Sequence, residues 1–327
     1  MAHSFNDIRQ LFSKFLEKNL FFKNPQSLYD PMNYLISLGG KRARPAMALM
    51  AHELFDELDE NAYNIAMAIE VFHNFTLMHD DIIDEATHRR AKPTVHYKYN
   101  TNVAILSGDA MMIESYEWIS KVDNAALIPG LYSTFNKHAL GVCYGQQMDL
   151  EFETRNDVSI DEYIEMIRLK TAVLLGCSMY MGAAVAGADE KAQKHLQLFG
   201  ENIGIAFQLQ DDFLDTYGDP EKFGKRVGGD IIQNKKTYLY LKALELAGDK
   251  QKSRLEQLYN DEHNLSDEEK VEEVRQIFNT LVIPEYVNQL MDAYNNLGIS
   301  HLKALGLEKE KYEPLLELCA YLLQRNT

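Results

Sequence analysis

The sequence predicts an all-α protein, because helical patterns recur along its 327 residues and strand patterns do not. Apolar residues repeat at steps of three and four, which is the spacing of one face of an α-helix. Proline, which breaks helices, occurs only 8 times. No linker is rich enough in proline, glycine or serine to mark a domain boundary. We therefore expect one all-helical domain over residues 1–327, built from ten or more helices.

The helices of the first half have recognisable ends. A helix over residues 32–38 should stop at Gly39, because glycine commonly follows a helix C-terminus. Pro45 then lies near the start of the next helix, where its missing N–H costs little. Apolar residues at three- and four-residue steps predict one long helix over about 60–85.

Capping boxes mark two helix starts in the second half. Ser159 with Glu162, and Ser266 with Glu269, each place a serine three residues before a glutamate. In this arrangement the serine and the glutamate each bind a backbone N–H at the helix N-terminus. We therefore expect a helix over 160–171 and another that begins at residue 267.

The charge of the chain limits what it binds. The net charge is −16, which argues against nucleic-acid binding, because that binding depends on an excess of lysine and arginine. An acidic protein can still bind an anion where its basic residues are concentrated. The positions of the basic residues are therefore more informative than their number.

Cysteine usage and hydropathy predict a cytoplasmic protein with no membrane span. Cys143, Cys177 and Cys319 match no zinc spacing, and we expect reduced and mostly buried thiols. The N-terminus has no apolar segment of the kind found in signal peptides. The most apolar run, 171–187, is too short for a membrane span and rich in small residues, so it should be a buried helix.

Two acidic motifs carry the expected chemistry, 75-FTLMHDDIID-84 and 207-FQLQDDFLD-215. Residues four apart on a helix lie about 40° apart around its axis, so Asp80 and Asp84 share one face. Asp81 lies about 100° away and can reach that face only from its edge. The same spacing recurs in the second motif at Asp211, Asp212 and Asp215.

Carboxylates stacked in this way repel one another unless a cation lies between them. Oxygen ligands suit Mg²⁺, which keeps several waters and commonly bridges to substrate phosphates. A single DDxxD motif favours a solvated helix end. Two copies, each preceded by an apolar helical stretch, favour a pair of metal sites.

Basic residues gather in four short clusters near glycines, helix ends or small polar residues: 39-GGKRAR-44, 88-HRR-90, 169-LKT-171 and 224-GKRVGGDIIQNKK-236. Arginine grips a phosphate through two parallel N–H groups, whereas lysine acts as a point charge. Clusters of this kind between two acidic motifs indicate a site for phosphorylated ligands.

These motifs resemble those of trans-isoprenyl diphosphate synthases, the polyprenyl synthetase family. The matching segments follow the family's order and are 39-GGKRARP-45, 72-FHNFTLMHDDIIDEATHRRAKPTVH-96, 108-GDA-110, 145-GQQMDL-150, 170-KT-171 and 206-AFQLQDDFLDTYGDPEKFGKRVGGDIIQNKKT-237. They span about residues 39 to 237, and the remaining C-terminal third matches only as helices. The resemblance implies a single large helical bundle of the isoprenoid synthase type with a central cavity, and a homodimer.

The resemblance also implies a role for each motif residue. Asp80, Asp84 and Asp211 would hold three Mg²⁺ ions against an allylic diphosphate, with Asp81, Asp212 and Asp215 at the edge of the site or behind these ligands. The allylic diphosphate would be bound by Arg89, Lys170, Lys225 and Lys235, with support from Gln146 and Asp149. The diphosphate of isopentenyl diphosphate would be bound by Lys41, Arg44, His73 and Arg90. Lys170, Thr171 and Gln208 are the expected catalytic residues, and the Thr171 hydroxyl and backbone with Gln208 would face the developing allylic cation.

The implied reaction is the head-to-tail (1′-4) condensation of isopentenyl diphosphate with an allylic diphosphate. Metals and fixed cationic side chains stabilise the negative charge that develops on the leaving diphosphate. The isopentenyl double bond attacks carbon 1, and in this family the released diphosphate is the base that takes the proton. The product would be a short-chain all-trans prenyl diphosphate, as in the geranylgeranyl and farnesyl diphosphate synthases that the chain resembles.

Product length should depend on the residues just before the first motif. Phe75 and Thr76 lie five and four positions before Asp80, about one helical turn deeper. In this family an aromatic residue at the fifth position alone goes with a C20 product, and aromatic residues at both go with C15. We therefore expect C20 ahead of C15, with Phe75 as the floor of the product channel or, failing that, Phe72.

One residue departs from the family's usual pattern. Glycine normally follows the paired arginines, whereas Ala91 follows Arg90 here. If the backbone at this point has a positive φ, alanine strains it.

Four other interpretations are open. A class I terpene cyclase shares the fold and one acidic motif, but its second motif normally mixes Asn or Asp with Ser or Thr and Glu. A longer-chain polyprenyl diphosphate synthase would differ in the floor of the channel. A ferritin-like di-iron site would use the two Glu-x-x-His pairs at 70–73 and 85–88, but such pairs belong on different helices. A regulatory subunit of a heteromeric synthase would be expected to lack aspartates from one motif.

Overall fold

The computed structural model describes residues 3–219 and 227–323, and nearly all of their regular structure is helical. This confirms the all-α prediction. The chain divides into two compact units. The first unit comprises Met1–Asn136, Cys177–Gln197 and Leu305–Leu315, and the second comprises Lys137–Gly176, Leu198–Ala304 and Leu316–Thr327. That the whole chain is one domain stays a prediction.

The helices fall into three groups by unit. Those wholly in the first unit are α1 (Phe5–Lys18), α2 (Gln26–Ser37), α3 (Ala43–Glu53), α4 (Glu60–Ile83), α5 (Val95–Lys98) and α6 (Thr101–Ser120). Those wholly in the second are α8 (Ile160–Ile167), the π-helix η1 (Arg168–Ala172), α12 (Gly229–Ile232), α13 (Tyr238–Leu246), α14 (Asp249–Tyr259), α15 (Asp267–Thr280) and α16 (Ile283–Lys303). Those with residues in both are α7 (Ile128–Thr154), α9 (Val173–Val185), α10 (Glu190–Tyr217) and α17 (Lys309–Leu323).

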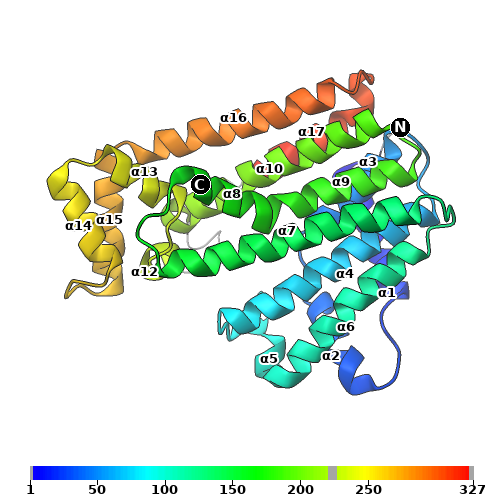
Figure 1. Cartoon of the computed structure of the whole chain (residues 1–327), viewed down its shortest axis with the longest axis horizontal. Helices are drawn as coiled ribbons and strands as arrows, with labels where there is room; N and C mark the ends of the chain where they lie inside the picture. Colours follow the sequence, from blue (N-terminus) through cyan, green and yellow to red (C-terminus); the bar gives the residue numbers. More distant parts are fainter. Residues whose placement is uncertain (1–2, 220–226, 324–327) are drawn as a thin grey trace. The chain divides into compact units, whose positions relative to one another are not determined.

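The first unit is organised around α4, which lies side by side with α6 (Figure 1). Helix α4 matches the predicted helix over 60–85 to within two residues. The side chain of Asp59 caps it by accepting the Ala62 N–H at 2.9 Å. Apolar residues of α4, including Ile65 and Ile69, are fully buried. Because the helix ends at Ile83, the first acidic motif occupies its last turn and its C-cap, Asp84.

A short hairpin, absent from the sequence-based prediction, follows α4. Its strands are β1 (His88–Arg89) and β2 (Lys92–Pro93), which pair antiparallel. The two residues between them, Arg90 and Ala91, have φ of 53° and 59°. Positive φ at both positions is what a type I′ hairpin turn requires, and the second position favours glycine. The condition under which Ala91 strains the backbone is therefore met, and the positive φ costs roughly 1 to 2 kcal/mol relative to a right-handed conformation.

The second unit confirms both predicted capping boxes. Ser159 caps α8 and Ser266 caps α15, each with the glutamate three residues later. Around them, α13 packs against α16, and α14 and α15 lie side by side (Figure 1). Buried apolar residues of these helices, such as Leu239, Val274 and Val287, form one core cluster.

The predicted helix over 160–171 is not a single α-helix. The α-helical turns end at Ile167, and residues Arg168–Ala172 form the π-helix η1 before α9 begins.

Most of α9 is buried, as expected for the apolar run over 171–187. No helix in the described part of the chain is long and apolar enough to cross a membrane. None of the three cysteines forms a disulfide, and Cys177 and Cys319 are buried whereas Cys143 is exposed.

Candidate active site

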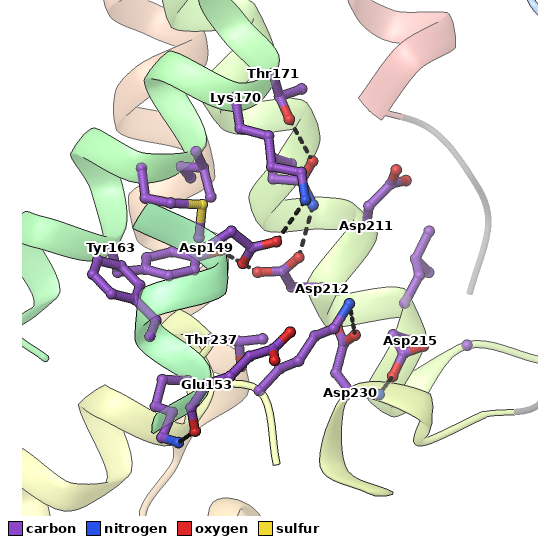
Figure 2. Close-up of a pocket in the computed structure, with 18 of the residues that line it drawn as sticks. Asp149, Glu153, Tyr163, Lys170, Thr171, Asp211, Asp212, Asp215, Asp230 and Thr237 are labelled. Carbon is purple, nitrogen blue, oxygen red and sulfur yellow. Dashed lines mark hydrogen bonds and ion pairs between the residues drawn. The ribbon is translucent and has the colours of Figure 1, made fainter. Parts of the chain in front are cut away.

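The second unit contains a cavity of about 660 Å³, lined by α7, α8, η1, α10 and the segment 230–237 (Figure 2). Its wall is strongly charged. The carboxylates that line it are Asp149, Glu153, Asp211, Asp212, Asp215, Asp219 and Asp230. The lysines that line it are Lys170, Lys235 and Lys236. The second acidic motif is therefore part of a cavity wall rather than a solvated helix end.

The π-helix η1 brings Lys170 into this wall. The Lys170 Nζ donates a hydrogen bond to Asp149 Oδ2 at 2.5 Å. Two glycines hold η1 by letting neighbouring helices approach its backbone. A Cβ on Gly145 of α7 would lie 2.2 Å from the Lys170 nitrogen, and one on Gly204 of α10 would lie 2.6 Å from the Ala172 Cα. Real Cβ atoms do not come so close to a backbone, so both positions need glycine.

Next to Lys170, a chain of hydrogen bonds links Thr171 to the second acidic motif (Figure 2). The Thr171 hydroxyl donates to Gln208 Oε1 at 3.0 Å, and Gln208 Nε2 donates to Asp212 Oδ1 at 2.9 Å. The Tyr163 hydroxyl of α8 donates to the other oxygen, Asp212 Oδ2. Each oxygen of Asp212 therefore accepts a hydrogen bond from the protein, which fits its expected place behind the direct metal ligands.

The crowding of carboxylates changes the acidity of this wall. The pKa of Asp212 is held well above its usual range, first by burial and then by the negative charge of Asp230, with a smaller contribution from Asp211. A cation in the cavity would relieve this repulsion, and carboxylate oxygens are the ligands that Mg²⁺ prefers. The donor set therefore fits Mg²⁺. Among the described residues, no three metal-binding side chains already converge on one point.

Asp215 connects the motif to the segment after α10. Its Oδ2 accepts the Asp230 N–H at 2.8 Å, and its backbone oxygen accepts the Gly228 N–H at 2.6 Å. These bonds bring Asp230 and Lys235 to the cavity, where Lys235 Nζ lies 3.7 Å from Asp230 Oδ1. Of the other expected residues, Gln146 is not among the lining residues of the cavity, and Lys225 lies outside the described residues.

The first acidic motif has the same division of roles in the first unit. Asp81 is only 2% exposed, and its two oxygens each accept a hydrogen bond from Arg89 Nε at 2.9 Å. Burial still raises the pKa of Asp81, although Arg89 opposes that shift. Asp84 is exposed, and Asp80 is half-buried, with Oδ2 4.0 Å from Arg89 Nη2. Asp81 thus holds the hairpin arginine, whereas Asp80 and Asp84 are the more accessible pair.

The first unit also gathers the basic residues expected to bind a second diphosphate. Arg44 Nη1 lies 3.1 Å from His73 Nε2. Gly40 lies against the guanidinium of Arg90, since a Cβ there would be 2.6 Å from Nη2. Lys41 is half-buried in the segment between α2 and α3. Burial, followed by the positive charge of Arg44, holds the pKa of His73 well below its usual range, so His73 is neutral near pH 7.

Known proteins match this chain over most of its length. A model of the family described as "Polyprenyl synthetase" matches residues 25–281. The chain belongs to the polyprenyl synthetase family. It is 35% identical to the geranylgeranyl pyrophosphate synthase of Geoglobus acetivorans over 98% of each chain, and 34% identical to the geranylfarnesyl diphosphate synthase of Natronomonas pharaonis over 72% of this chain and 74% of that one. A crystal structure of a geranylgeranyl pyrophosphate synthase matches with a TM-score of 0.94 and 42% identity, covering 99% of this chain and 100% of that chain.

The chain is therefore a prenyltransferase with the helical fold of the isoprenoid synthases. Enzymes of this family generally depend on Mg²⁺ and act on prenyl diphosphates. The family also argues against the ferritin-like interpretation. Glu70, the first residue of one Glu-x-x-His pair, forms an ion pair with Arg42.

In this synthase, an aromatic column runs along α4 below the first acidic motif. Phe75 and His79 are in edge-to-face contact, with ring centroids 4.9 Å apart. The ring centroid of Phe72 lies 5.4 Å from that of Phe75. Phe72 also packs edge-to-face against Phe135, with ring centroids 5.1 Å apart. Thr76 donates a hydrogen bond to the His73 carbonyl at 2.8 Å. Phe75 is half-buried and Phe72 fully buried, so Phe75 is the more accessible of the two.

Sequence reasoning gave no individual role to Tyr163, Asp230 or Lys236, although Asp230 and Lys236 lie within the basic cluster 224–236. Tyr163 lies on the buried face of an amphipathic helix, where an aromatic residue normally signals core packing. Lys236 is buried and donates to the Glu153 carbonyl at 2.9 Å. Asp230 is an acidic residue among the lysines and the arginine of that cluster. No local signal distinguishes these residues, because their partners are distant in the sequence.

Proposed function

We propose that this enzyme condenses isopentenyl diphosphate with allylic diphosphates, head to tail, to give the C20 all-trans product geranylgeranyl diphosphate and free diphosphate. The observation that carries the proposal is the cavity of the second unit. It combines acidic oxygens that suit Mg²⁺, lysines that suit a diphosphate, and a threonine–glutamine pair that suits a developing cation. Chain elongation needs all three.

The acidic residues are proposed to hold the metal. Asp211 would be a direct ligand in the second unit, and Asp80 and Asp84 direct ligands from the first motif. Bound Mg²⁺ would supply positive charge against the leaving diphosphate. Asp81 and Asp212 would hold neighbouring side chains in place, since both are buried and hydrogen-bonded to protein donors. The binding of three ions is part of this proposal.

When the allylic C–O bond breaks, the lysines are proposed to stabilise the diphosphate, and the Thr171–Gln208 pair is proposed to stabilise the allylic carbon. Lys170 and Lys235 would bind the diphosphate as point charges, together with Arg89. Oxygen atoms of Thr171 and Gln208 would face the allylic carbon as it becomes positive. Such fixed dipoles act where charge develops, and they need no reorganisation during the reaction.

The second substrate is assigned to the basic group of the first unit. Lys41, Arg44 and Arg90 would bind the diphosphate of isopentenyl diphosphate. A neutral His73 accepts a hydrogen bond from Arg44 and would help to orient that guanidinium. Two arginines can each grip phosphate oxygens in a bidentate manner.

The finer assignments rest on the aromatic column and on α6. Phe75 is proposed as the floor that stops elongation at C20, since a packed aromatic does not yield to a growing chain.

Helix α6 carries an exposed apolar stripe formed by Ile105, Leu106, Met112 and Ile113. A stripe of this kind fits a helix that pairs with another copy of the chain, so we propose that it forms the homodimer interface.

A direct assay tests the function. The purified chain is incubated with Mg²⁺, isopentenyl diphosphate and a C5, C10 or C15 allylic primer, and the products are separated by chain length. We expect C20 as the main product from each primer. Diphosphate release from the allylic substrate alone, with cyclic hydrocarbon products, would indicate a terpene cyclase instead. Inactivity of the chain alone would indicate a regulatory subunit.

A further inference from the structure

Asp212 is the buried anchor of the hydrogen-bond chain that ends at Thr171. Tyr163 donates to one of its oxygens and Gln208 to the other. Tyr163 itself is only 2% exposed, and its hydroxyl reaches Asp212 from α8 while Gln208 approaches along α10. The carboxylate is therefore held from two helices at once.

The donors and acceptors in this chain follow one direction. Asp212 Oδ1 accepts, so the Gln208 amide must turn its NH₂ group toward it. The same amide must then turn its oxygen toward Thr171, which makes Thr171 the donor in that bond. In this arrangement both oxygens of Asp212 accept, one from Tyr163 and one from Gln208. The direction of donation along the whole series of hydrogen bonds, from Thr171 to Gln208 to Asp212, is thus set at Asp212.

This direction has a consequence in the cavity, which Thr171 and Gln208 both line. The Thr171 hydroxyl proton points to Gln208, so its oxygen presents electron density to a ligand. An oxygen in this orientation stabilises a developing cation, whereas a hydroxyl proton in the same place would oppose it.

We propose that Tyr163 is a positioning residue for the condensation reaction. By fixing the Asp212 carboxylate, Tyr163 fixes the Gln208 amide, and through it the orientation of the Thr171 hydroxyl toward the allylic carbon. The inference rests on the proposed function, because it assigns Thr171 to the developing cation. Tyr163 touches neither substrate nor metal in this assignment and acts only through Asp212.

The variant Tyr163→Phe removes the hydroxyl and keeps the ring that packs in the core. We expect kcat to fall about ten-fold or more, while KM for both substrates changes less than about two-fold, because the orientation matters in the transition state more than in binding. Tyr240→Phe is the matched control, since Tyr240 is another buried tyrosine of the same core cluster. It should leave kcat unchanged. Melting temperatures measured for both variants report any general loss of stability.

A double-mutant cycle separates positioning from simple packing. Thr171→Val removes the hydroxyl that Tyr163 is proposed to orient, and it should lower kcat by itself. In that background Tyr163→Phe should change kcat less than about two-fold, because the group it orients is gone. Two effects that multiply in full would overturn the proposal, as would a Tyr163→Phe enzyme with wild-type kcat.

The assay also distinguishes this inference from the function on which it rests. If the wild-type chain makes no prenyl diphosphate from isopentenyl diphosphate, the proposed function fails. If the wild type elongates normally and Tyr163→Phe does so equally well, only the role of Tyr163 fails. A Tyr163→Phe variant that loses stability and raises both KM values, with kcat retained, would make Tyr163 a packing residue and would also overturn the inference.

Discussion

Asp81 and Asp212 hold the same place in their motifs, the second position of DDxxD, and they have the same kind of environment. Both are buried, and both accept hydrogen bonds at their two oxygens, Asp81 from Arg89 and Asp212 from Tyr163 and Gln208. The first aspartates, Asp80 and Asp211, are more accessible. The angle of about 100° between neighbouring residues on a helix accounts for this difference, because one residue faces a cavity or solvent when the next faces the interior.

Phe75 provides a test at the scale of one residue. Phe75→Ala should lengthen the main product from C20 to C25 or beyond, because it removes the ring that we propose as the floor of the product channel. Reverse-phase chromatography of the dephosphorylated products measures the change. Relatives named geranylgeranyl and geranylfarnesyl synthases are 35% and 34% identical to this chain, over 98% and 72% of its length.

The control for this test is Phe22→Ala, which removes a ring that is 84% exposed and should leave product length unchanged. If Phe75→Ala still stops at C20 while Phe72→Ala does not, the floor lies one turn deeper, at the ring that packs against Phe135. An unchanged product from both variants would contradict the assignment of the floor to α4.

At the scale of the element, η1 decides where Lys170 and Thr171 point. A π-helix inserts one extra residue into a turn, and such turns often occur at functional sites. Here it lies between α8 and α9 and is held by glycines on α7 and α10. The periodicity of the sequence predicts a helix over this region. It cannot detect the one extra residue of a π-helical turn, because that turn depends on the helices that pack against it.

Gly145→Ala tests the role of this packing. The new methyl group would clash with the Lys170 backbone, so η1 must move, and we expect kcat to fall by about 100-fold, since displacements near 1 Å can cost this much. Steady-state kinetics measures the loss, and circular dichroism confirms that the helices are retained.

Gly141→Ala, one turn earlier on α7, is the matched control. A Cβ there would meet only side chains, at an ordinary contact distance of 3.5 Å. This variant should keep wild-type activity, and it should gain stability of up to about 1 kcal/mol from alanine's higher helix propensity. Equal activity in both variants would mean that the close approach at Gly145 does not control the site.

At the scale of the whole molecule, the exposed stripe on α6 predicts the oligomeric state. Leu106→Lys places a charge at a side chain that is 60% exposed, so it should not disturb the folded monomer. In a homodimer formed through α6 it would bury an unpaired charge, which costs several kcal/mol. Size-exclusion chromatography with light scattering should therefore give a dimer for the wild type and a monomer for Leu106→Lys.

The control is Leu297→Lys on α16, where the side chain is 48% exposed. This variant should remain a dimer. A wild-type monomer at micromolar concentration, or a Leu106→Lys protein that still dimerises, would contradict an interface on α6.

The sequence by itself determined the helical class, the capped helix starts and the sharing of one helical face by Asp80 and Asp84, because each depends on residues within a turn or two of one another. The order of the motifs likewise identifies the family without any tertiary structure. Only the tertiary structure decided that Arg168–Ala172 forms a π-helix, that the Arg90–Ala91 turn has two positive φ angles, and that Tyr163 meets Asp212. The π-helix and the Tyr163–Asp212 bond depend on packing between segments far apart in the chain, and the turn depends on strand pairing and on the arginine held by Asp81. Contacts of this kind are specified by the whole fold and not by a local pattern.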